Sequence, residues 1–300
     1  MSMIKWSKEL SIWSGKLSNV GLTVPNAINI TLNETQKFQT IIGFGGAFTD
    51  AAGINLAKLS PGAQQNLIRS YYGPEGIGYT LGRTPMASCD FSAREYSYDD
   101  VDGDFNLTNF ALTQEDYIYK VYSDPDAYKI VDGLAIHWYA DQSTSDIVDP
   151  YHLTDAHNAY PDKFLLYTEV LQHWVTGWTD WNICLDPQGG PNWVNNWCDS
   201  PIIVSNTTDE FEKQPMYYGL GHFAKFIVPD SVIIGLNFEG NTNQTNLEAI
   251  AALNPSGQKV VVLNNRDVAS TYQISVINKQ GSALNLAIEP RSFTTIVWSE

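Results

Sequence analysis

The chain has 300 residues, a hydrophobic content of 43% and a formal net charge of -16 at pH 7. So acidic a chain is unsuited to binding nucleic acid, because phosphate contacts require clustered lysine and arginine. No apolar run reaches the roughly 18 residues of a membrane-spanning helix, and residues 1–8 lack the apolar core of a secretory signal. The cysteines are odd in number and lack metal-type spacing, so they suggest neither a disulfide framework nor a zinc site.

The N-terminal part predicts strands followed by a helix. Turn-forming residues separate short strand candidates, which cover residues 22–24, 28–32 and 38–42. The Gly43-Phe44-Gly45-Gly46 run lacks the dinucleotide-binding spacing, so we expect its glycines to let the backbone pass close to a neighbour. A helix is predicted over 61–72, because Ser60 suits the N-cap, Pro61 suits the first position and Gly73 follows the last turn.

Residues from about 41 to 185 alternate between strand-like and helix-like segments. The strand candidates cover residues 41–46, 79–87, 133–140, 164–169 and 177–185. Such alternation is typical of an α/β barrel or an open parallel sheet. In a barrel, catalytic groups lie where strands finish, and Glu169 stands at the end of one of these candidates.

From about Val232 the pattern changes to short alternating strands separated by turn residues. These candidates cover residues 260–263, 272–277, 284–288 and 293–298, a pattern typical of a β-sandwich. Because chain termini often lie close together, we expect the N-terminal strands to join the same sandwich. The predicted parts are therefore sandwich strands in 1–41, a barrel-like region in 42–216, and a helix leading into the main part of the sandwich in 217–300.

Several motifs occur in a fixed order along the chain. They are Phe38–Ala52, Arg83–Ser92, His137–Tyr139, Gly177–Asn182, Gly189–Val194 and Asp199–Val204, with further similarity at Lys213–Tyr218 and Gly221–Phe223. Together they resemble lysosomal glucosylceramidases (acid β-glucosidases) and their relatives in family 30 of the glycoside hydrolases. The resemblance covers most of the chain from about residue 20 onward. One tetrapeptide would be weak evidence, but the ordered set is specific.

This resemblance implies an α/β fold plus an all-β domain: a TIM (β/α) barrel that carries an immunoglobulin-like β-sandwich built from both chain ends. It implies hydrolysis of glucosylceramide to glucose and ceramide with retention of configuration. It places the nucleophile at Glu169. By the same resemblance, the residues that contact the sugar or lie near the nucleophile are Asp90, Trp181, Asn196, Tyr139, His137 and Arg83.

The side-chain chemistry suits these implied roles. An attacking carboxylate must be ionised, so a cation such as Arg83 would help by lowering the pKa of Glu169. Asp90 can accept hydrogen bonds from sugar hydroxyls, and Asn196 can both donate and accept them. Trp181 offers a flat apolar face to a sugar ring.

One feature of the family is missing. Its acid/base glutamate lies in an Asn-Glu-Pro motif, which this chain lacks; the nearest string, Asn33-Glu34-Thr35, falls among the N-terminal strands. The resemblance breaks near Lys120–Val121, with a shorter gap near Val170–Leu171. Residues 42–216 also fall short of the about 250 residues and eight strands of a TIM barrel. At roughly 30 residues per βα unit, about three units are missing. We therefore predict an incomplete barrel without its acid/base residue, as in a shortened isoform, a gene duplicate or an incomplete gene model.

Other interpretations compete at several positions. If the chain is active alone, Asp90 or Asp180 would have to donate the proton. Cys89 is predicted to be a buried thiol, because no general base stands beside it in the sequence. Core packing is the prediction for Trp178, Trp193 and Trp197. The alternative function is that of a catalytically inactive relative that binds glycolipid or a protein partner.

The resemblance also implies partners and a location. The substrate would be glucosylceramide or a related β-glucoside, with an anionic membrane surface and a small activator protein as further partners and the lysosome as the location. Because the chain is itself acidic, contact with anionic lipid should strengthen on acidification. No cofactor, metal ion or nucleic acid is expected.

Overall fold

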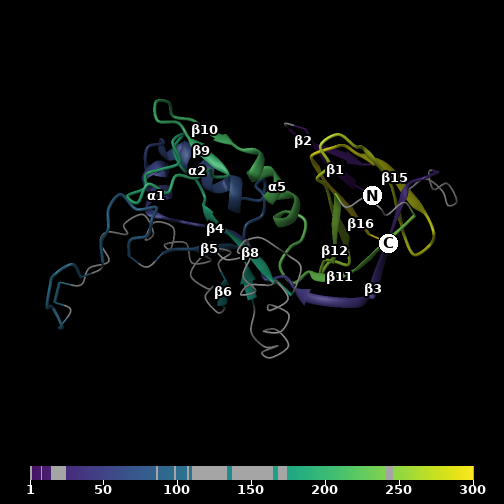
Figure 1. Ribbon diagram of the computed structural model, residues 1–300, viewed down its shortest axis with the longest axis horizontal. Coiled ribbons are helices and arrows are strands. Elements are labelled where there is room, and N and C mark those ends of the chain that lie inside the picture. Colours follow the sequence, from purple (N-terminus) through teal and green to yellow (C-terminus); the bar gives the residue numbers. More distant parts are fainter. Residues whose placement is uncertain are drawn as a thin grey trace. The chain divides into compact units, whose positions relative to one another are not determined.

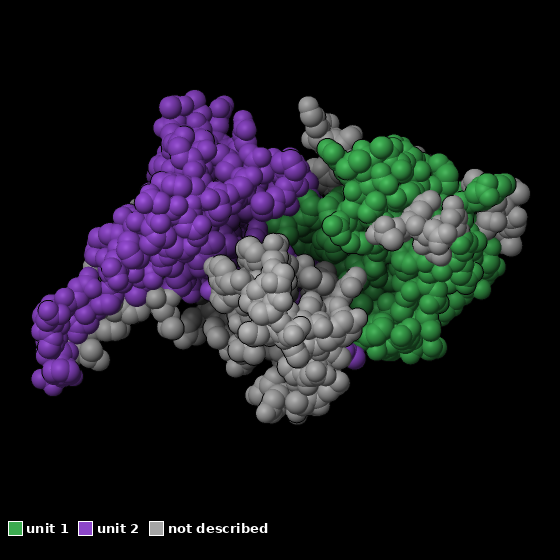
Figure 2. All heavy atoms as spheres, in the orientation of Figure 1, with its two compact units in different colours: residues 1–42, 219–300 green, residues 43–218 purple. Residues whose placement is uncertain are grey.

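The computed structural model describes residues 2–7, 9–14, 25–85, 87–97, 99–106, 108–109, 134–136, 165–167, 174–240 and 246–299. The chain divides into two compact units (Figure 2). Unit 1 contains residues 1–42 and 219–300, and unit 2 contains residues 43–218. Each unit has its own sheet.

Unit 2 is built on a parallel sheet. Its strands are β4 (Gly43–Ala47), β5 (Leu81–Arg83), β6 (Leu134–Ile136), β7 (Leu165–Tyr167) and β8 (Gly177–Asn182), in the order β5-β4-β8-β7-β6. Each coincides with a segment that the sequence predicts to be a strand, although β4 runs one residue past its predicted end at 46, so these predictions are confirmed.

The strand order of unit 2 is cyclic. The first of these strands, β4, pairs with the last, β8, and every pairing in the sheet is parallel. A barrel wound in sequence order closes in the same way, with its first strand beside its last. Among the described strands the ring is open only between β5 and β6.

Glycines and helix caps account for the local geometry around β4. A Cβ atom on Gly45 would lie 2.1 Å from the Leu81 carbonyl oxygen, so only glycine permits this approach of β4 to β5, as the sequence predicts. The helix α2 (Pro61–Tyr72) begins after Ser60, whose side chain accepts a hydrogen bond from the Ala63 N–H, and its C-cap is Gly73.

Further elements complete unit 2 (Figure 1). Helix α1 (Asp50–Ala57) is N-capped by Thr49 and was not predicted from the sequence. Strands β9 (Ile202–Val204) and β10 (Phe211–Lys213) pair antiparallel, and helix α5 (Pro215–Ala224) carries the chain from unit 2 into unit 1.

Unit 1 consists of a nine-stranded sheet. Its strands are β1 (Ser2–Ser7), β2 (Glu9–Ser14), β3 (Ile28–Thr40), β11 (Val232–Glu239), β12 (Leu247–Leu253), β13 (Lys259–Asn265), β14 (Tyr272–Ile277), β15 (Ala283–Ile288) and β16 (Ser292–Trp298). Their order is β15-β14-β3-β11-β12-β13-β16-β1-β2. Strands from both ends of the chain therefore form one domain.

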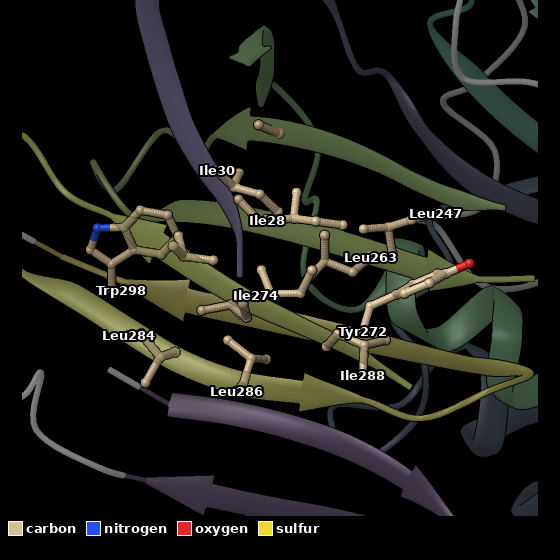
Figure 3. Packing of buried hydrophobic residues seen from close by; sticks show 14 of the residues in the cluster. Ile28, Ile30, Leu247, Leu263, Tyr272, Ile274, Leu284, Leu286, Ile288 and Trp298 are labelled. Atoms are coloured by element: carbon tan, nitrogen blue, oxygen red, sulfur yellow. The ribbon is translucent and has the colours of Figure 1, made fainter. Parts of the chain in front are cut away.

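An apolar core lies inside unit 1 (Figure 3). Ile30, Leu263, Ile274 and Ile288, from β3, β13, β14 and β15, are completely or almost completely buried in it. Residues of β15 and β16, far apart in the sheet order, share this core, so the sheet curls over on itself.

Strand β3 differs from its prediction. The sequence suggests two strands, 28–32 and 38–42, but the structure has one strand from Ile28 to Thr40. The pairing of β3 with β11 shifts register between Val232 and Ile234 and again before Gly235. Such bulges bend a strand without ending it. The polar residues in the middle of β3 resemble a turn in the sequence, but in the structure they continue the strand.

Candidate active site

Four of the predicted site residues lie in the described part of unit 2, namely Arg83, Asp90, Trp181 and Asn196. The predictions for Glu169, His137 and Tyr139 fall outside the described residues. Strand β6 ends at Ile136 and β7 at Tyr167, shortly before those positions in the sequence. Because the strands are parallel, their carboxyl ends share one edge of the sheet, where barrel enzymes carry their active sites.

Asp90 and Asn196 contact each other although 106 positions separate them in the sequence. The Asn196 Nδ2 group donates a hydrogen bond of 2.9 Å to Asp90 Oδ2. The other oxygen, Oδ1, accepts a hydrogen bond of 3.1 Å from the Phe91 N–H. Both oxygens of this carboxylate are therefore held by donors.

Trp181 connects this pair to Arg83. The Arg83 guanidinium carbon lies 4.6 Å from the centre of the Trp181 ring, a cation–π contact. Phe91, next to Asp90, meets Trp181 edge-to-face, with ring centroids 6.3 Å apart and an interplanar angle of 82°. All four described site residues are thus joined through Phe91, which is buried against Ala51 and Leu185.

Asn196 stands on a loop that its own polar residues hold together. Asn192 Oδ1 accepts hydrogen bonds from the N–H groups of Val194 and Asn196, and its Nδ2 donates to the Asn196 carbonyl. At the start of the loop, the buried Asn55 side chain donates a hydrogen bond of 2.7 Å to the Gly190 carbonyl. These bonds fix the loop before any ligand binds.

The core-packing prediction is wrong for two tryptophans of this loop. Trp193 is 41% exposed and Trp197 is 52% exposed. The indole Nε1 of Trp193 instead donates a hydrogen bond of 2.7 Å to the Cys89 carbonyl, beside Asp90. Nothing in the sequence signals this contact, because it depends on how the loop folds back over residues 89–90.

Asp180 of β8 is a half-buried residue whose carboxyl oxygen Oδ2 is buried. Its Oδ1 accepts a hydrogen bond of 2.9 Å from the Trp181 N–H, while its Oδ2 has no hydrogen-bond partner among the described residues. Burial raises the pKa of Asp180 to about 6, because the charged form loses its water and gains little in return. The nearby Tyr79 hydroxyl is also buried and lacks a partner in the described part of the chain.

Two other groups are unsuited to catalysis. Glu34, from the string nearest to Asn-Glu-Pro, lies in unit 1 and pairs with Lys259 at 3.0 Å and Lys279 at 2.9 Å, so its role there is structural. Cys89 is half-buried rather than buried as predicted, and this partial burial raises the pKa of its thiol to about 11, which leaves it a poor nucleophile near neutral pH.

The described residues contain no group of three or more His, Cys, Asp or Glu side chains that could hold a metal ion. Within the same residues, no helix is long and apolar enough to cross a membrane. A pocket of about 500 Å³ in unit 2 includes none of the predicted site residues; it is lined by Asn66, Arg69, Ser70, Glu75, Phe211, Lys213 and Tyr218.

Comparison with known families decides the class of the protein. The TIM-barrel domain of glycosyl hydrolase family 30 matches residues 41–123, 118–172 and 169–227, and the β-sandwich domain of the same family matches residues 230–296. The chain belongs to glycosyl hydrolase family 30. The fold predicted from the sequence, a barrel domain with a β-sandwich domain, is thereby confirmed, as is membership of a glycoside hydrolase family.

Proteins similar to the chain cover most of its length. A Caenorhabditis elegans protein whose name provisionally designates a glucosylceramidase is 28% identical, over 91% of this chain and 82% of that protein. The mouse lysosomal acid glucosylceramidase is 29% identical, over 86% of this chain and 80% of the mouse protein. The alignment with the C. elegans protein runs over 438 positions, many more than this chain has residues.

Solved structures agree on the fold. SrfJ from Salmonella typhimurium matches with a TM-score of 0.80 at 18% identity, covering 100% of this chain and 99% of that one. An endo-β1,6-glucanase matches with a TM-score of 0.76 at 18% identity, again covering 100% of this chain and 99% of its own. At such identities the likeness concerns the fold alone.

Proposed function

We propose that this family 30 chain is a retaining β-glucosidase of the glucosylceramidase type, with Glu169 as its nucleophile and without a residue to protonate the leaving group. One observation carries the proposal: Asp90 and Asn196, predicted to bind the sugar, are hydrogen-bonded to each other and linked through Phe91 to Trp181. A specific sugar-binding surface explains why residues so far apart in the sequence meet at one end of a barrel-like sheet.

In the proposed reaction, the Glu169 carboxylate forms a bond to the anomeric carbon while the bond to the leaving oxygen breaks. Without an acid/base residue, the leaving oxygen takes its proton from solvent. Water then attacks the glucosyl–enzyme intermediate and gives up a proton to solvent, which releases glucose and restores the carboxylate. Asp90 and Asn196 hold sugar hydroxyls, and Trp181 supports the ring. Arg83, with His137 and Tyr139, lies near the nucleophile and keeps it ionised.

Several observations support an internal gap in the barrel. The family model matches in three pieces that meet at residues 118–123 and 169–172, where the resemblance also breaks. The cyclic strand order is open between β5 and β6, and the first of these breaks lies between those strands in the sequence. An Asn-Glu-Pro motif is absent from the whole sequence. The lost segment would have carried the acid/base glutamate.

Neither aspartate near the site is suited to replace that glutamate. Asp90 accepts hydrogen bonds on both oxygens, an arrangement for binding rather than for donating a proton. Asp180 has the raised pKa of a general acid, but its Oδ2 oxygen is buried and its Oδ1 oxygen is held by the Trp181 N–H. Loss of a general acid typically slows a reaction about 10²–10⁴-fold. We therefore expect slow cleavage of glucosylceramide, whose alkoxide is a poor leaving group.

The second candidate function is a catalytically inactive relative that binds glycolipid or a protein partner. It is favoured by the contrast between the two domains: the family sandwich model matches in one continuous piece, whereas the barrel model matches in three. In either case, a β-glucoside, an anionic membrane and an activator protein are the proposed partners, and the lysosome is the proposed location.

A fluorinated glucoside that traps the glucosyl intermediate, followed by peptide mass spectrometry, separates these two functions. We expect one glucosyl group on Glu169, and none in Glu169→Gln, because trapping requires a nucleophile but not an acid when fluoride is the leaving group. Folded wild-type protein that remains unlabelled would contradict the enzymatic proposal and favour the inactive relative.

A further inference from the structure

Trp193 reaches the segment that carries Asp90 through two hydrogen bonds. Its indole Nε1 donates to the Cys89 carbonyl at 2.7 Å, and its backbone N–H donates to the Asp90 carbonyl at 3.4 Å. Two consecutive carbonyl groups are thus held by one residue. Three positions further along, Asn196 holds the Asp90 side chain.

Burial does not account for a tryptophan at this position. The residue is 41% exposed, so a large part of its apolar surface stays in contact with water. What only tryptophan provides here is an N–H at the far edge of a rigid ring. That group reaches across from the loop to residue 89.

The loop is rigid enough to transmit this contact. The hydrogen bonds from Asn192 hold Val194 and Asn196, and the Asn55 side chain anchors Gly190. Because the loop is fixed internally, the Trp193 indole acts as a brace between the loop and residues 89–90. A loose loop would not restrain Asp90, however many bonds it made.

We infer that Trp193 is a positioning residue of the sugar site: its indole N–H holds the backbone at residues 89–90 so that Asp90 and Asn196 present their polar groups together to a sugar hydroxyl. The inference rests on the proposed function for its ligand. Trp193 need not touch the sugar to act in this way. The inference adds to the site a residue that is predicted from the sequence to pack in the core.

The test compares Trp193→Phe with Trp197→Phe. Both variants remove an indole N–H from an exposed residue of the same loop, but among the described residues only Trp193 uses it in a hydrogen bond. Titration calorimetry with a glucose-configured iminosugar should show about 2- to 10-fold weaker binding for Trp193→Phe, the value of one net hydrogen bond, and unchanged binding for Trp197→Phe.

A double-mutant cycle identifies the route of the effect. In an Asp90→Ala background, Trp193→Phe should cause no further loss, because the side chain that it positions is gone. Equal losses in both backgrounds, or equal losses for the two tryptophan variants, would overturn the inference. If Trp193→Phe does not fold, incorporation of 3-benzothienylalanine at position 193 keeps the ring shape and removes only the N–H.

A ligand-free measurement separates this inference from the proposed function. In NMR spectra, the Trp193 indole N–H should exchange slowly for an exposed ring, and Trp193→Phe should shift the Asn196 side-chain amide while Trp197→Phe leaves it in place. If the wild type and the two variants show this pattern but the wild type binds no iminosugar, the result would contradict the proposed function alone. An unshifted Asn196 amide in Trp193→Phe would overturn the positioning role.

Discussion

The surroundings of the Asp180 carboxyl group oppose its ionisation. One oxygen has a backbone donor, and the other has no partner within the described residues. The described groups that interact with it are the phenols of Tyr71 and Tyr79 and the thiol of Cys198. All are neutral near pH 6, because their ordinary pKa values of 10.0 and 9.0 lie well above 6 and burial raises them further. No described cation offsets an ionised Asp180, so the protonated form is preferred in the folded state.

The stability of unit 2 should therefore depend on pH through this residue. The folded pKa, about 6, lies above the ordinary value of 3.8, so the stabilisation is complete below pH about 4 and is lost as the pH rises through 6. Asp180→Asn removes this ionisation. Between pH 4 and pH 7, the difference in free energy of unfolding between the variant and the wild type should shift in favour of the variant by up to about 3 kcal/mol. Urea unfolding at the two pH values measures this difference. A pH profile parallel to that of the wild type would show that Asp180 is not the group responsible.

At the scale of elements, a cluster of ion pairs links β3 to other parts of the sandwich. Glu34 of β3 pairs with Lys259 of β13, whose side chain is 6% exposed, and with Lys279, whose side chain is 57% exposed. Burial would raise the pKa of Glu34, but hydrogen bonds from Lys279 and Lys259 hold it below its usual value. The two lysines share one carboxylate and differ in burial.

Removing the carboxylate should cost much more than removing the exposed lysine. Glu34→Gln removes the carboxylate that pairs with the buried ammonium group of Lys259 as well as with Lys279, so we expect a loss of about 3–5 kcal/mol in the free energy of unfolding. Lys279→Met removes an exposed ion pair and should cost at most about 1 kcal/mol. Denaturant titration monitored on the sandwich measures both, and similar losses for the two variants would contradict this account.

How far the sequence predicts the elements depends on whether their causes are local. Strand β7 follows from an apolar run, and helix α2 follows from the caps at Ser60 and Gly73; both signals are visible in the sequence. The single strand β3 does not, because its bends depend on pairing with β11. Helix α1 contains Gly53 and Asn55, which are poor helix formers, and it depends on distant contacts such as that of Asn55 with Gly190.

The candidate site shows the same division. Arg83, Asp90, Trp181 and Asn196 could be named from motifs that resemble a known family, and the structure brings these four together. The hydrogen bond of the Trp193 indole could not be predicted, since it joins a loop to a segment more than 100 positions away. Resemblance identifies residues with chemical roles, but not those that hold them in place.

At the scale of the whole molecule, two carboxylates give the units opposite responses to acid. Protonation of Asp180 favours unit 2 below pH about 6, whereas protonation of Glu34 weakens unit 1 below its usual pKa of about 4.5. Both contributions are favourable together only near pH 5. A chain with a net charge of -16 also loses self-repulsion over this range as carboxylates protonate. The molecule is thus suited to a mildly acidic compartment, in agreement with the proposed lysosomal location.

The opening between β5 and β6 in the ring of described strands leads to the central proposal, that Glu169 is the attacking carboxylate and that its proton donor is missing. The dependence of the hydrolysis rate on the leaving group tests it most directly. The leaving group of dinitrophenyl β-glucoside needs no protonation, so this substrate should be cleaved, and Glu169→Gln should abolish the cleavage. The rate of glucosylceramide hydrolysis should be about 10²–10⁴-fold below that of an intact family member assayed in parallel. Equal and ordinary rates on both substrates would show that a proton donor is in place and would contradict the account.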